Sequence, residues 1–232
     1  MSIERNIDLV YERIEHACET YGRTDAVVLQ IAAKTQSADS CFQAAQHLSH
    51  SAHPILLGHN RVQEARDTAE AIHAIPHSRI HLIGPLQSNK INMALSCVDA
   101  IDTLDRVDII EPLSKRLMHP LPVMIQVNVS GEITKSGCAP TVVNTLVDAV
   151  NECDSLILTG FMTVGLNSSH EAPVRRAYEH LRLLRDRTAQ RLNLPENALE
   201  LSMGMSHDLE WAIAEGSTRV RVGTAIFGPR IR

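Results

Sequence analysis

The sequence predicts a single (β/α)8 barrel, a TIM barrel of the α/β class, preceded by one extra helix. Short apolar runs rich in β-branched residues alternate with longer segments of helical period, as in βα units around a parallel sheet. Eight such runs are present, and 232 residues suit one barrel domain. An open, doubly wound sheet is the alternative topology. No Gly/Ser-rich linker or low-complexity tract divides residues 1–232, so one domain is expected.

The extra helix is expected at residues 3–18, where apolar side chains recur at helical spacing among charged ones. The candidate strands are residues 27–32, 54–57, 80–83, 100–102, 123–129, 156–162, 199–202 and 220–222. Helical spacing returns between the strands, as at Cys41, Ala44, Ala45 and Leu48. Eight strands with intervening helices fit a closed barrel better than an open sheet.

Composition excludes several kinds of partner. The chain has 22 Lys+Arg against 27 Asp+Glu, a formal net charge of −5 without long blocks of either sign, so no nucleic acid is expected. No apolar run reaches the roughly 20 residues of a membrane span, and the charged N-terminus cannot serve as a secretory signal. The 5 cysteines form no zinc-ligand spacing, and His47, His50 and His53 span a helix end. We therefore expect a cytoplasmic protein with free thiols and no metal.

The stretch VVLQIAAKTQ ends an apolar strand with a cation, Lys34. Active sites of TIM barrels lie at the C-terminal ends of the strands, so Lys34 is expected at the pocket. An ammonium at the rim of an apolar wall is partly desolvated, which favours its neutral, nucleophilic form and a Schiff base with an aldehyde. A solvated loop lysine is the alternative.

Two small polar turns follow the last two predicted strands: residues 202–206 (SMGMS), and Gly223 with Thr224. Free backbone N–H groups at helix starts, together with Ser and Thr hydroxyls, can hold an anion without a basic side chain. TIM barrels often hold phosphate at the loops after strands seven and eight. The sequence thus predicts a phosphate site here, although the glycines alone are also consistent with simple turns.

Arg221 alternates with Val220 and Val222 in the last strand, so its side chain faces the opposite way. It points either into the barrel or outward under a helix. Arg219 has the same parity, but only Arg221 lies near the C-terminal end of the strand.

Five segments, in order along nearly the whole chain, resemble the pyridoxal 5′-phosphate (PLP) homeostasis proteins, relatives of the N-terminal barrel of alanine racemase. They are AAKTQ around Lys34, GHNRVQEA at residues 58–65, HLIGPLQSNK at 81–90, IQVNVSGEITKSG at 125–137 and LSMGMSHDLEWAIAEGSTRVRVGTAIFG at 201–228. The resemblance implies PLP as the cofactor, held as an internal aldimine on Lys34. The other implied cofactor-binding residues are Asn60 beside the ring, Ser202, Met203, Ser206, Gly223 and Thr224 at the phosphate turns, and Arg221 near the pyridine nitrogen.

The chain departs from the family pattern at three positions. His59 and Arg61 stand where the family usually has glutamate and tyrosine, and Ala33 replaces the common serine before Lys34. His59 is either a titratable group that changes cofactor affinity with pH or a plain loop histidine. These departures bear on how tightly PLP is retained.

Two functions remain open, a PLP carrier and a PLP-dependent amino-acid racemase. An arginine at the ring nitrogen leaves the ring unprotonated and a weak electron sink, which disfavours carbanion chemistry. Racemisation also needs a base on each face of the substrate, and alanine racemases take the second, a tyrosine, from a C-terminal β-domain across a dimer interface. Here the chain stops at Arg232, and Tyr11, Tyr21 and Tyr178 lie in predicted helical or connecting segments.

We therefore expect no catalytic residue and a role in buffering or delivering PLP. A monomer is expected, with recipient PLP-dependent apo-enzymes as candidate partners.

Overall fold

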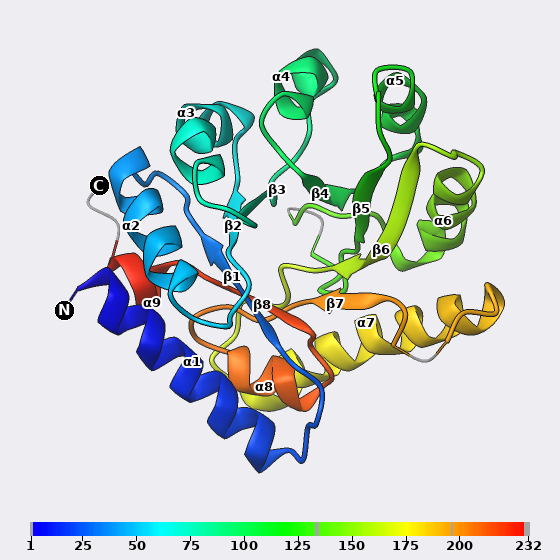
Figure 1. Ribbon diagram of the computed structural model, residues 1–232. Coiled ribbons are helices and arrows are strands. Elements are labelled where there is room, and N and C mark those ends of the chain that lie inside the picture. The colour runs from blue at the N-terminus through cyan, green and yellow to red at the C-terminus, as the bar shows by residue number, and fades with distance from the viewer. Residues whose placement is uncertain (1, 133–134, 196, 230–232) are drawn as a thin grey trace.

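The computed structural model describes residues 2–132, 135–195 and 197–229 of the 232-residue chain. These residues form a closed barrel of eight parallel strands in chain order, surrounded by helices (Figure 1). The strands are β1 (Val28–Ala32), β2 (Leu56–His59), β3 (Arg79–Leu82), β4 (Ala100–Leu104), β5 (Leu121–Gln126), β6 (Leu156–Met162), β7 (Glu200–Ser202) and β8 (Arg219–Val222). Because β8 pairs with β1, the predicted TIM barrel is confirmed and the open sheet is wrong.

The helices connect the strands on the outside of the barrel. They are α1 (Ile3–Thr20), α2 (Ala38–Ser49), α3 (Val62–His73), α4 (Ile91–Leu95), α5 (Ile110–Ser114), α6 (Val143–Asn151), α7 (Glu171–Arg191), α8 (Leu209–Ala214) and α9 (Thr224–Phe227). Short 3₁₀ turns cover Ser88–Lys90, Val107–Ile109 and Pro140–Val142.

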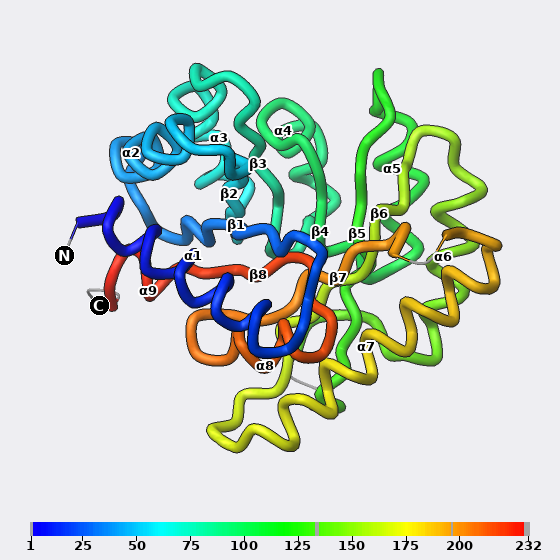
Figure 2. The backbone as a smooth tube through the Cα atoms, turned by 60° about the horizontal axis from the view of Figure 1, so that its bottom comes forward, coloured from blue at the N-terminus to red at the C-terminus, as the bar shows by residue number. Residues whose placement is uncertain are grey.

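The predicted extra helix is α1, which packs against α8 and α9 along one side of the barrel (Figure 2). Its N-cap Ser2 accepts a hydrogen bond from the Arg5 backbone N–H, and its buried side includes Ile7, Val10 and Ile14. The helix thus covers α8, which follows β7, and α9, which follows β8.

All eight predicted strands are present, but two are displaced. The fifth, predicted at residues 123–129, runs Leu121–Gln126, and the second lies further along the chain than predicted. The sequence places it at residues 54–57, whereas β2 runs Leu56–His59. Pro54 has no N–H to give to a ladder, and the pairing of β2 with β3 continues to His59 opposite Leu82. His59 is therefore the last residue of a strand, and the prediction of a loop histidine is wrong.

In the ranges that the structure describes, no helix is both long and apolar enough to cross a membrane. Within the same ranges, no group of His, Cys, Asp and Glu side chains gathers that could hold a metal ion. His47 instead pairs with Asp8 of α1, at 2.7 Å between Nε2 and Oδ1. Ile133 and Thr134 of the fourth matched segment, and Arg232, lie outside the described residues.

Candidate functional site

A cavity of about 250 Å³ opens at the C-terminal ends of the strands. Its lining comes from the segments after β1, β2, β3, β6, β7 and β8. Six of the eight residues predicted to bind the cofactor lie in its wall: Lys34, Asn60, Ser206, Arg221, Gly223 and Thr224. The barrel therefore brings together residues that are up to 190 positions apart in the sequence.

Lys34 is directed into the cavity by a tight turn that follows β1. The Gln36 backbone N–H donates to the Ala33 carbonyl at 3.2 Å, which closes the turn around Lys34 and Thr35. Thr35 has a φ of 63°, a left-handed conformation that is strained for a β-branched residue. Such strain is found mostly at functional sites, and here it fixes the residue next to Lys34.

Asn60 is held in the wall by a close approach of two backbones after β2 and β3. A Cβ on Gly84 would lie 2.0 Å from the Asn60 carbonyl oxygen, so only glycine fits there. The same holds for Gly223, where a Cβ would lie 2.7 Å from the carbonyl oxygen of Ala32, next to the lysine turn. Both glycines let segments of the cavity wall approach each other closely.

The turns after β7 and β8 leave hydrogen-bond donors available at the cavity. Among the described residues, the backbone N–H groups of Ser206 and Thr224 donate no hydrogen bond. The Ser206 hydroxyl accepts from the Ala225 N–H at 3.3 Å and so links the two turns. Two unpaired N–H groups and two hydroxyls, from Ser206 and Thr224, suit an anion with several oxygen atoms such as a phosphate.

Asp208 and Arg13 support the turn after β7, and sequence reasoning missed both. Asp208 accepts from the Met205 N–H at 2.7 Å through Oδ1 and from the Tyr178 hydroxyl at 2.8 Å through Oδ2. Arg13 of α1 donates to the Ser206 carbonyl at 3.1 Å. Asp208 stands directly before α8, and an aspartate at such a helix start was a signal that could have been used.

Arg221 lies in the wall and is held by two hydrogen bonds. Its Nη1 donates to the Ser202 hydroxyl at 2.7 Å and its Nη2 to the Thr163 carbonyl at 2.5 Å. Burial lowers the pKa of Arg221 below its usual value, with the charges of Tyr178 and Asp102 acting in the opposite direction. A guanidinium nevertheless stays charged in proteins, so the site holds a fixed cation.

Ser202 and Met203, the other two predicted residues, do not line the cavity. Both are fully buried. Ser202 ends β7 and its hydroxyl supports Arg221, whereas the Met203 backbone bonds to Arg219 and Ser217. The structure therefore gives Ser202 an indirect role in the site and Met203 a place in the core.

Several residues of the wall were not predicted. They are Ala32, Gln36, Ile83, Met162, Val164, Met205, His207, Phe227 and Gly228. Most of them end a strand or follow one within a few positions, which is the signal that identified Lys34. His207 adds a titratable side chain directly after Ser206.

The three departures from the family pattern lie outside the cavity wall. His59 is fully buried, and its Nε2 is 3.0 Å from the Thr68 hydroxyl of α3, on the outer side of the barrel. Ala33 is also fully buried, and Arg61 is the exposed N-cap of α3. Of the three, none lines the cavity.

We expect His59 to make the stability of the protein depend on pH. Burial lowers the pKa of His59 from 6.5 to about 4. Between these values the unfolded chain binds more protons than the folded one, so stability falls as the pH is lowered through that window. The free energy of unfolding should fall by about 2 kcal/mol from pH 7 to pH 5 on account of this group.

Urea denaturation of the wild type and of His59→Gln at both pH values tests this prediction. The glutamine removes the titration and keeps a polar group near Thr68, so the variant should lose less stability on acidification. Equal losses in the two proteins would assign the pH dependence to other groups.

The three tyrosines lie away from the cavity wall. Tyr11 stacks on His53 with ring centroids 3.7 Å apart, and Tyr21 is 39% exposed. Burial, with the charge of Asp208, raises the pKa of Tyr178 well above its usual value, so its hydroxyl remains protonated. These positions provide no tyrosine base at the cavity.

Comparison with known proteins identifies similar chains. The family model of the alanine racemase N-terminal domain matches residues 10–230. A pyridoxal phosphate homeostasis protein of Pseudomonas aeruginosa is 40% identical over 234 residues, which cover 99% of this chain and 96% of that one.

Two solved structures share the fold. PipY of Synechococcus elongatus, solved with PLP bound, has a TM-score of 0.81 at 26% identity and covers 98% of this chain and 100% of its own. Alanine racemase of Clostridium difficile has a TM-score of 0.72 at 13% identity and covers 100% of this chain but 57% of its own. At 13% identity, the comparison with the racemase supports a shared barrel fold and nothing about function.

Proposed function

This chain belongs to the pyridoxal phosphate homeostasis protein family, which carries the alanine racemase N-terminal fold, and we propose that it binds PLP in the cavity at the C-terminal end of the barrel. Lys34 holds the cofactor as a Schiff base, and the protein buffers and delivers PLP in the cytoplasm. It acts as a monomer on this proposal, with PLP-dependent apo-enzymes as recipients.

One observation carries the proposal: an amine and an anion cradle lie in the wall of the same cavity. Lys34 is the single lysine among the residues that line it. The Ser206 and Thr224 turns supply unpaired N–H groups and hydroxyls for a phosphate. The amine suits an aldehyde and the cradle suits a phosphate, so the cavity suits a molecule that carries both groups.

PLP supplies an aldehyde that reacts reversibly with a neutral amine. Held at the turns that contain Ser206 and Thr224, PLP would present this aldehyde to Lys34 Nζ, which would condense with it and release water. Because hydrolysis would reverse this condensation, binding and release would use one reaction.

Arg221 supports a carrier over a racemase. Its guanidinium is fixed by Ser202 and Thr163, and an arginine does not readily give a proton to the ring nitrogen. The ring then withdraws electrons weakly, which disfavours carbanion chemistry. A racemase would also need a second base, and the tyrosines lie away from the cavity wall.

The test is an absorption titration of the purified protein with PLP, followed by borohydride reduction and peptide mass mapping. We expect a saturable visible band and one reduced adduct, on the peptide that contains Lys34. Excess inorganic phosphate should weaken PLP binding, because it competes for the turns after β7 and β8.

The outcomes separate the claims. An adduct spread over surface lysines, or no saturable band, would refute PLP binding at this cavity. An alanine racemase assay on the same sample should show no turnover, and sustained racemisation would instead establish the enzyme.

A further inference from the structure

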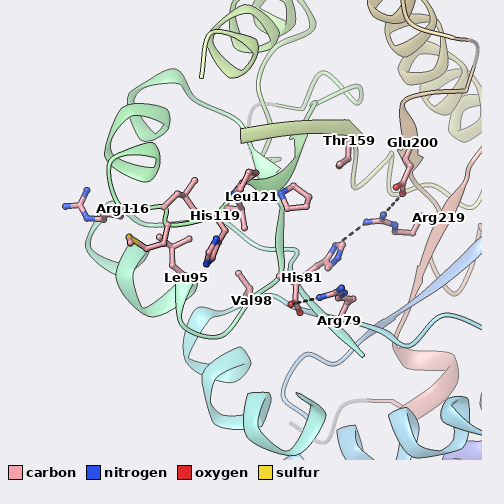
Figure 3. A pocket seen from close by; sticks show the side chains of 15 residues that line it. Arg79, His81, Leu95, Val98, Arg116, His119, Leu121, Thr159, Glu200 and Arg219 are labelled. Carbon is pink, nitrogen blue, oxygen red and sulfur yellow. Dashed lines mark hydrogen bonds and ion pairs between the residues drawn. The ribbon is translucent and has the colours of Figure 1, made fainter. Parts of the chain in front are cut away.

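A cavity of about 790 Å³ opens at the opposite, N-terminal end of the barrel, and Figure 3 shows its lining side chains. Arg79, Leu121, Glu200 and Arg219 line it, and they are the first residues of β3, β5, β7 and β8. The proposed PLP cavity is formed instead at the last residues of the strands and after them. The two cavities are therefore separate sites on one barrel, and the volume of this one suits a small molecule.

A buried ionic cluster forms the inner end of this cavity. The Asp102 carboxylate accepts from His81 Nδ1 at 2.9 Å, from Gln30 Nε2 at 3.0 Å and from Arg219 Nη1 at 3.2 Å. Barrel interiors are usually filled by branched apolar side chains, and a buried ion cluster costs desolvation energy that apolar packing would avoid. Such a cluster in a cavity wall indicates a functional site.

The charges of the cluster are fixed by its contacts. Burial alone would raise the pKa of Asp102, but the charges and hydrogen bonds of His81 and Arg219, with the Gln30 amide, hold that pKa well below its usual range. Asp102 is thus an anion, and because a carboxylate only accepts, His81 Nδ1 carries a proton.

Two nitrogen atoms of the cluster have no partner among the described residues. Arg219 is 6% exposed, and its buried Nε donates no hydrogen bond. His81 uses Nδ1 for Asp102, and its Nε2 makes no hydrogen bond while the side chain lines the cavity. Buried donors without a partner are rare in proteins, so Arg219 Nε calls for a ligand atom that accepts.

The remaining wall is apolar on one side and carries charged side chains of both signs. Leu95, Val98, Leu117 and Leu121 form the apolar side. Glu200, with its side chain 40% exposed, pairs with Arg219 Nη2. Figure 3 shows His81, Arg219 and Glu200 in a row along the inner wall. Glu200 thus occupies part of the Arg219 guanidinium, with which an anionic group of a ligand would also pair.

We propose that this second cavity binds a small organic carboxylate with an apolar body. The carboxylate pairs with the Arg219 guanidinium and accepts from its Nε, which has no partner among the described residues. The apolar body lies against Leu95, Val98 and Leu121. Glu200 competes with the ligand for Arg219 and so limits the affinity.

The test uses 1-naphthoate as the probe, measured by isothermal titration calorimetry on the full chain with and without excess PLP. We expect saturable binding at one site that PLP does not abolish. The neutral 1-naphthalenemethanol, with the same ring system, should bind at least about tenfold more weakly, because it lacks the charge that pairs with Arg219.

Variants locate the binding. Glu200→Gln should tighten 1-naphthoate binding by about threefold or more, because it removes the competing anion. The matched control is Glu12→Gln, which removes a glutamate paired with Arg5 on α1 and should leave the affinity unchanged.

Three results would overturn the proposal. They are no saturable binding at millimolar 1-naphthoate, an affinity that Glu200→Gln leaves unchanged or weakens, and equal binding of the neutral probe. Glu200 is partly exposed, so its substitution tests the site even if changes at the buried Arg219 prevent folding.

Discussion

Lys34→Ala is expected to abolish the visible absorption band of bound PLP and the borohydride-stable adduct. Among the residues that the structure describes, no other lysine lines the cavity, so no neighbouring amine there can take over the reaction. PLP should still bind reversibly through the turns that contain Ser206 and Thr224, but at least about 100-fold more weakly, because a covalent bond is lost. Absorption and equilibrium dialysis measure the two effects separately.

The fold should not change, because the Lys34 side chain makes no hydrogen bond or ion pair among the described residues. Lys90→Ala is the matched control, since Lys90 is also half-buried but lies outside the cavity wall. A visible band and an adduct that persist in Lys34→Ala would show that another group holds the aldehyde.

Gly84→Ala is expected to cause the largest loss of stability of any single methyl added to the site. The new Cβ would lie 2.0 Å from the Asn60 carbonyl oxygen. The nearest atoms all belong to the Asn60 backbone, which cannot rotate away as a side chain can. The segments after β2 and β3 must separate, at a cost of about 3 kcal/mol or more in the free energy of unfolding. Asn60 moves with its backbone, so PLP affinity should fall as well.

Urea denaturation with Gly22→Ala as the control separates the clash from a general cost of replacing glycine. Gly22 has a φ of 64° and nothing within 4 Å of an added Cβ, so its replacement should cost about 1 kcal/mol from backbone strain alone. If the two variants lost equal stability, the close approach at Gly84 would not be a constraint on the site.

The barrel and the position of Lys34 were predictable because both follow from local patterns. A buried strand in a parallel sheet appears as a continuous apolar run, and the first polar residue after it lies at the C-terminal end of the barrel. Lys34 follows the run that ends at Ala32, and the structure places it in the cavity wall.

His59 shows where local patterns fail. The predicted boundary of β2 was two residues too early, and strand boundaries are the least certain part of a sequence pattern. A histidine at the end of a strand faces either the barrel interior or the surrounding helices. His59 faces the helices and lies against Thr68 of α3. Similarly, the sequence places Ser202 and Ser206 in one turn. In the structure Ser206 lines the cavity, whereas Ser202 is buried in the barrel and accepts a hydrogen bond from Arg221.

The cluster around Asp102 could not be predicted because its members come from four strands. Gln30, His81, Asp102 and Arg219 lie on β1, β3, β4 and β8. Their meeting depends on the stagger of a closed barrel, which one sequence does not specify. Arg219 and Arg221 share one parity on β8, and the structure places them in the walls of opposite cavities.

The left-handed Thr35 has a consequence for protein engineering. The direction of Lys34 is set by the backbone turn from Ala33 to Gln36 rather than by the rotamer of a long, flexible side chain. A lysine grafted alone onto another barrel would keep that flexibility and sample many directions. Transplanting an aldehyde-capturing lysine into a new scaffold therefore requires moving the four-residue turn as a unit, including its costly third residue.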